Sequence, residues 1–147
     1  MRKVAATVLV SAVAALALAA LSSAGTQSVM GVSAKLTAAQ EVPKQVVKNT
    51  TASGFFSARL SGKKLTWKLT FSGLTGPATA AHIHMAAMGK SGNVVVVLCA
   101  STCKSGKTGT AMLTSGLLTA LSKHLLYVNV HTAKNPNGEI RGQLAEH

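Results

Sequence analysis

Apolar and polar residues alternate along much of the chain after residue 32. Residues 56–60 and 65–71 show this most clearly, because every second residue there is apolar or aromatic. A period of two turns one side of the chain toward a core and the other toward solvent, which is typical of half-buried antiparallel strands. Short segments rich in Gly, Asn and Pro, which favour turns, separate the alternating stretches. The sequence therefore predicts strands at residues 32–40, 54–61, 64–71, 79–86, 93–99, 109–114, 125–132 and 139–145.

One stretch departs from this alternation. Within residues 115–123, Leu117, Leu118 and Leu121 have the spacing of one face of a helix, which predicts a short helical turn between two strands. Many short strands at regular spacing with a single helical turn indicate an all-β fold, either an antiparallel sandwich or a barrel.

The first 24 residues have the composition of a secretory signal peptide. Arg2 and Lys3 form a short positive start, residues 4–21 are almost entirely apolar, and the small residues that follow suit cleavage after Ala24. The alternative is a retained membrane anchor. It is disfavoured because alanine is only weakly apolar and no aromatic or basic cluster follows the stretch. We therefore expect an exported protein, either secreted or held in the periplasm or cell envelope.

Cleavage at this point leaves a chain of a size that suits one hydrophobic core. Residues 25–32 are mostly small or polar and are predicted to form a flexible leader, and residues 33–145 are predicted to form a single domain.

The charge balance is strongly basic. The whole chain carries +12, and loss of Arg2 and Lys3 leaves 13 basic residues against three acidic ones, a net charge of +10. Such a charge favours an anionic partner, for example an envelope or extracellular polymer, although a merely solvated surface is the alternative. Specific nucleic-acid binding is not expected, because the lysines are mostly scattered singly and aromatic residues are only 3% of the chain.

Acidic residues are scarce, which removes much catalytic chemistry. The chain has no Asp, and its acids are Glu41, Glu139 and Glu146. Paired-carboxylate catalysis needs two acids at a fixed separation, and a Ser-His-Asp relay needs an acid behind the imidazole. The sequence also lacks a G-x-S-x-G elbow, a Walker loop and a dinucleotide fingerprint. We therefore expect a protein that is not an enzyme.

Three histidines form the candidate site. His82 and His84 are two residues apart on one predicted strand, so both imidazoles leave the same face. By the same rule Tyr127, Asn129 and His131 share a face of the strand at 125–132. If the two strands are neighbours, the imidazoles converge and could bind copper or zinc, with an open position for water or substrate. The alternative is that the histidines are hydrogen-bonded across the sheet without a metal.

Four further polar residues are candidates for orienting these imidazoles from around the site. Glu139 and Arg141 are two apart on the last predicted strand and could pair with each other or reach the His131 strand, and Tyr127 and Asn129 lie on the face of His131 itself. A plain surface ion pair between Glu139 and Arg141 is the alternative and would contribute little to stability.

The only cysteines are Cys99 and Cys103, which flank a three-residue segment. An even pair in an exported chain predicts a disulfide. The alternative, a pair of thiolate metal ligands, needs a reducing compartment, which the signal peptide argues against.

Several segments together resemble the CHRD (chordin) domain. They are Leu36, Glu41–Pro43, Gly54–Phe56, Leu74–Gly76, Ala80–His84, Tyr127–Thr132 and Pro136–Leu144. The resemblance covers residues 33–145 and matches in order, spacing and identity. It implies a bacterial single-domain secreted member with an extracellular, immunoglobulin-like (Greek-key) β-sandwich of about seven or eight strands.

The resemblance does not carry a specific activity. Chordin-type proteins carry the domain in tandem within secreted modulators of growth factors, whereas this chain has one copy and none of their cysteine-rich modules. The histidine pattern is also similar to that of copper-zinc superoxide dismutase. However, without Asp the chain lacks the zinc-ligand carboxylate, and the fourth copper imidazole is unassigned, so we do not expect dismutase activity.

Two functions are left. The first is an exported, non-enzymatic binding or structural module with no resident cofactor, whose partner is an unidentified protein or an anionic polymer. The second is an extracytoplasmic copper- or zinc-binding protein, which uses His82, His84 and His131 in metal handling or redox protection.

Overall fold

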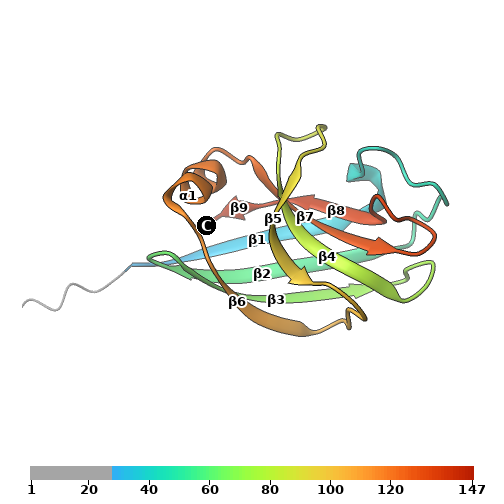
Figure 1. The fold of residues 1–147 in the computed structure, drawn as a ribbon, viewed down its shortest axis with the longest axis horizontal. Helices are drawn as coiled ribbons and strands as arrows, with labels where there is room; N and C mark the ends of the chain where they lie inside the picture. Colours follow the sequence, from blue (N-terminus) through green and yellow to red (C-terminus); the bar gives the residue numbers. More distant parts are fainter. Residues whose placement is uncertain (1–27) are drawn as a thin grey trace, which may run out of the picture.

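The computed structural model describes residues 28–147, so the predicted signal peptide at residues 1–24 lies outside the described residues. The described residues form nine strands, a 3₁₀ turn, η1 (Ala38–Gln40), and one helix, α1 (Ser115–Ser122) (Figure 1). The strands are β1 (Val29–Thr37), β2 (Ser53–Ser61), β3 (Lys64–Ser72), β4 (Ala78–Met85), β5 (Asn93–Cys99), β6 (Lys107–Met112), β7 (Leu126–Thr132), β8 (Ile140–Gln143) and β9 (Ala145–Glu146).

The strands pair in the order β5-β4-β7-β8-β1-β2-β3-β6, and β9 lies beside β1. The pairings are antiparallel throughout. β8 meets β1 at a single residue pair, Thr37 and Arg141. The sheet therefore turns at this point, and the β5-β4-β7-β8 half lies over the β1-β2-β3-β6 half (Figure 1). The predicted all-β antiparallel sandwich is confirmed, with nine strands in the described residues instead of seven or eight.

The core lies between the two halves and is built by the alternation seen in the sequence. Several core side chains are 0% exposed. Among them, the β5-β4-β7-β8 half contributes Ile83, Val128 and Val130, and the β1-β2-β3-β6 half contributes Leu36 and Phe56. Full burial of an aliphatic or aromatic side chain of this size contributes about 1.5–3 kcal/mol to the free energy of unfolding. This face of β4 and β7 therefore holds the sandwich together, and the other face is left to carry the polar residues.

β1 begins at Val29, inside the stretch 25–32 that is predicted to be a flexible leader. Met30 pairs with Leu60 of β2, and Gly31 exchanges backbone hydrogen bonds with His147, of 3.0 and 3.1 Å. The sequence of this stretch shows no alternation, so the start of β1 was not predicted. Residues that are distant in the sequence supply the pairing there. β1 also ends earlier than expected, at Thr37, because η1 occupies residues 38–40.

The predicted helical turn and the predicted disulfide are both present. α1 begins after Thr114, whose side chain accepts a hydrogen bond from the backbone N–H of Leu117 at 3.2 Å. The disulfide joins Cys99, the last residue of β5, to Cys103, and their Cα atoms are 5.8 Å apart. Among residues 28–147, no helix has the length and apolar character needed to cross a membrane.

Candidate metal centre

The candidate site lies where β4 and β7 run side by side. In their antiparallel register His82 faces Asn129, His84 faces Tyr127, and His131 faces Ala80. The two strands are therefore neighbours, as the convergence of the imidazoles requires. Because side chains alternate along a strand, the three histidines leave the sheet on the face opposite the apolar core.

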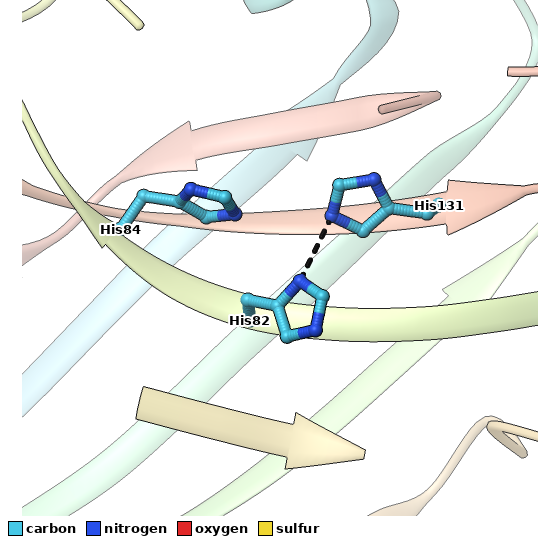
Figure 2. Close-up of side chains that lie close together, drawn as sticks. All are labelled: His82, His84 and His131. Atoms are coloured by element: carbon cyan, nitrogen blue, oxygen red, sulfur yellow. Dashed lines mark hydrogen bonds between the residues drawn. The ribbon is translucent and has the colours of Figure 1, made fainter. Parts of the chain in front are cut away.

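The three imidazoles converge in space (Figure 2). Each offers one ring nitrogen, and these nitrogens all lie within 4.8 Å of one another. The closest pair is Nδ1 of His82 and Nε2 of His131, 3.1 Å apart. The rings of His84 and His131 have centroids 5.9 Å apart. A set of nitrogens this compact needs only small side-chain movements to reach one ion at the distance of about 2 Å that imidazole ligands adopt.

Backbone carbonyls fix two of the three rings. Nδ1 of His131 lies 2.9 Å from the carbonyl oxygen of Pro136, and Nδ1 of His84 lies 2.9 Å from that of Gly92. A carbonyl only accepts, so Nδ1 of each ring carries the proton and donates it. In the neutral ring, Nε2 then holds a free lone pair. Such contacts set the tautomer and the orientation of a metal-binding histidine.

All three histidines are held in the neutral form. Burial lowers the pKa of His131 to about 4, even though its bond to Pro136 acts in the opposite direction. Burial also lowers the pKa of His84, and the positive charge of Arg141 lowers it further, against the raising effect of the Gly92 bond. Burial and then the neighbouring His84 lower the pKa of His82. At neutral pH the site therefore presents unprotonated imidazoles, the form that binds metals.

Nε2 of His84 has an unusual environment. It has no contact with solvent and no hydrogen-bond partner among the described residues. A buried polar atom without a partner destabilises a folded protein by about 1–3 kcal/mol. Hydrogen bonding across the sheet accounts for His82 and His131, which contact each other, but it leaves this lone pair unused.

Tyr127 and Arg141 form a stack behind His84. The Tyr127 ring lies parallel to the His84 ring, at 10° and with centroids 4.9 Å apart, and the Cζ of Arg141 lies 3.4 Å from the Tyr127 centroid. The Arg141 guanidinium also donates to the carbonyls of Lys90 and Ala87, at 2.8 and 3.3 Å. Arg141 thereby holds the β4–β5 loop, which carries Gly92, against the site.

Asn129 serves a different partner from the one expected. Its amide nitrogen donates to Glu41 at 3.0 and 3.3 Å, beneath the segment that follows η1. Burial raises the pKa of Glu41 to about 8, although the Asn129 bond and Arg141 lower it. Glu41 is 0% exposed, and it was not predicted to lie among the residues around the histidines. The available signal was its rarity, since it is one of three acids and lies in a segment that resembles the CHRD domain.

Glu139 ties loops together instead of orienting the imidazoles. Its carboxylate accepts hydrogen bonds from the Thr75 backbone and hydroxyl and from Thr132, each 2.6 Å long, and from Asn49 at 2.7 Å. Burial raises its pKa, but these bonds together outweigh burial and lower it. The expected pairing of Glu139 with Arg141 is thus replaced, because Glu139 precedes β8 and meets the loops while Arg141 contacts the β4–β5 loop.

Comparison with known families matches residues 32–144 to the CHRD domain, well over half of the chain. No curated protein and no solved structure gives a significant match.

Proposed function

The chain belongs to the CHRD-domain family, and we propose that it is an extracytoplasmic, non-enzymatic binding module that holds one copper or zinc ion between His82, His84 and His131. The observation that carries this proposal is the buried, unpartnered Nε2 of His84, which points into a cluster of nitrogens within 4.8 Å (Figure 2). An ion bound there would engage the lone pair that no residue of the described chain uses.

The proton states support the same proposal. Metal binding by a protonated imidazole requires loss of the proton, which weakens binding at neutral pH. Here the pKa of each ligand is lowered below its ordinary value before any ion arrives. The two carbonyl contacts of His84 and His131 also fix the ligand nitrogens in advance, so little ordering remains to oppose binding.

The surroundings favour binding over catalysis. Of the buried carboxyl groups, Glu41 is bonded to Asn129 and Glu139 to Thr75, Thr132 and Asn49. Both carboxyl groups are therefore engaged with residues other than the three histidines. The disulfide and the signal-like composition of residues 1–24 support a site outside the cytoplasm, where metal handling or protection from redox-active ions is the role we propose.

The test is direct titration of metal-free protein with copper and with zinc, followed by calorimetry and by metal analysis after gel filtration. We expect one ion per chain. His84→Ala and His131→Ala should each lose more affinity than the roughly 10–100-fold that loss of an outer partner of a metal ligand produces.

The matched control is His124→Asn. His124 has a φ of 54°, which Asn tolerates, and its Nδ1 lies 3.4 Å from the Leu144 carbonyl, away from the cluster. This variant should bind as the wild type does. Absence of stoichiometric binding at micromolar copper or zinc, or equal binding by His84→Ala, would overturn the proposal.

A further inference from the structure

The environment of the three imidazoles also bears on the charge of the ion, and this inference rests on the proposed metal site. We infer that the site takes copper as Cu(I), held by the three imidazole nitrogens alone, in preference to Cu(II) or Zn(II). Two independent features lead to this assignment, the local charge and the coordination that the surroundings allow.

The local charge is positive. The three ligands are neutral, and the guanidinium of Arg141 lies one aromatic ring beyond His84, stacked on Tyr127. Arg141 is 1% exposed, so solvent screens its charge only weakly. The nearby Glu41 does not offset this charge, because burial raises its pKa to about 8 and keeps it mostly protonated at neutral pH.

This charge discriminates between ions. A fixed positive charge about 10 Å from an ion, in surroundings of intermediate dielectric, lowers the affinity by roughly tenfold for each unit of ionic charge. A divalent ion therefore loses about tenfold more affinity than a monovalent one at the same position. The high positive charge of the chain, +12 in full and +10 without Arg2 and Lys3, acts in the same direction at longer range.

The number of ligands available at the site also favours Cu(I). Zn(II) in proteins takes four ligands in a tetrahedron, and Cu(II) favours four in a plane. Here the described residues offer three imidazole nitrogens, and because His82 and His84 are only half-buried, a divalent ion would have to recruit a water as its fourth ligand. The carboxyl oxygens of Glu41 and Glu139 are already bonded elsewhere, so they do not supply a fourth ligand. Cu(I) has a filled d shell and accepts three ligands without a fourth, which fits this set.

The experiment compares affinities for Cu(I), Cu(II) and Zn(II). Cu(I) is measured without oxygen, in competition with the chelator bicinchoninate, and the divalent ions are measured by calorimetry. The wild type should bind Cu(I) more tightly than Zn(II). Arg141→Gln should raise Zn(II) and Cu(II) affinity relative to Cu(I) by about tenfold, whereas Arg141→Lys, which keeps the charge, should keep the wild-type ratio. Arg59→Gln, at an exposed position of β2, is the control and should leave the ratio unchanged.

The outcomes separate the two proposals. Binding of all three ions without preference for Cu(I), or an Arg141→Gln ratio equal to the wild-type ratio, would overturn this inference and leave the metal site intact. Binding of none of the ions would overturn the proposed function itself. If the Arg141 variants do not fold, X-ray absorption of the copper-loaded wild type decides. Three nitrogen neighbours around Cu(I) support the inference, and a fourth ligand overturns it.

Discussion

The two faces of β7 are both buried, but by different means. On the inner face Ile83, Val128 and Ile140 meet the apolar side chains of the opposite half. On the outer face His131 and Arg141 are covered by the loops around them. All seven residues of β7 are buried, although its side chains alternate between apolar and polar. Burial therefore does not separate the two faces of β7, and the chemistry of the buried side chains does.

The two faces also differ in what they contribute to stability. Apolar contacts on the inner face are non-directional and favourable, whereas the outer face holds groups away from their preferred states in water. Its histidines are neutral, Glu41 is largely protonated, and Nε2 of His84 and Oδ1 of Asn129 lack partners among the described residues. The inner face thus stabilises the fold, and the outer face uses part of that stability to hold a preorganised site.

The largest expected effect is on the inner face. Ile83→Ala removes a 0% exposed side chain and should lower the free energy of unfolding by about 3–5 kcal/mol, measured by urea denaturation. Metal affinity of the protein that remains folded should stay close to that of the wild type. Val97→Ala, on the adjacent β5 and 58% exposed, is the control and should change stability little. A loss below about 1 kcal/mol for Ile83→Ala would contradict the division between the faces.

A smaller, pH-dependent effect is expected at Glu41. Its pKa is about 8 in the folded protein and 4.5 without the fold, so the folded state binds more protons between these values. This contribution to stability is fully present below about pH 4.5 and is lost as pH rises through about 8. Glu41→Gln cannot ionise, so at pH 9 it should be more stable than the wild type by a few kcal/mol, and within about 1 kcal/mol of it at pH 5.

Urea denaturation at pH 5, 7 and 9 measures this difference, and Glu146→Gln serves as the control acid. If Glu41→Gln shows no gain at pH 9, the carboxyl is not held protonated by burial.

The smallest effect is expected from the Tyr127 hydroxyl. Tyr127→Phe keeps the ring between His84 and Arg141 but removes the oxygen that accepts from the Gly92 N–H at 3.2 Å. We expect a loss of about 0.5–1 kcal/mol in stability and nearly unchanged metal affinity. Tyr127→Leu removes the ring and should weaken metal binding by roughly tenfold. Equal losses of affinity in the two variants would show that the stack has no part in positioning His84.

The alternation in the sequence was sufficient to predict which residues share a face of a strand. It was not sufficient to predict which groups surround those residues. The period of two in a strand is strict, so the sequence alone assigns His82 with His84, and Tyr127 with His131, to shared faces. The carbonyls of Gly92 and Pro136 could not be found this way, because every residue carries a carbonyl and its direction depends on the loop. Glu41 was missed for a related reason, since it lies outside the periodic stretches and its burial comes from tertiary packing.

The contact between His82 and His131 joins residues 49 positions apart in the chain. During synthesis the first two imidazoles emerge together, and the third follows only after β5, β6 and α1 have been made. A newly made chain therefore offers a two-nitrogen chelate at first, and the third nitrogen joins when β7 docks beside β4. If the site binds an ion as proposed, coordination by all three nitrogens would therefore report that β7 has docked, and chains halted before this docking would hold the ion through two nitrogens at most.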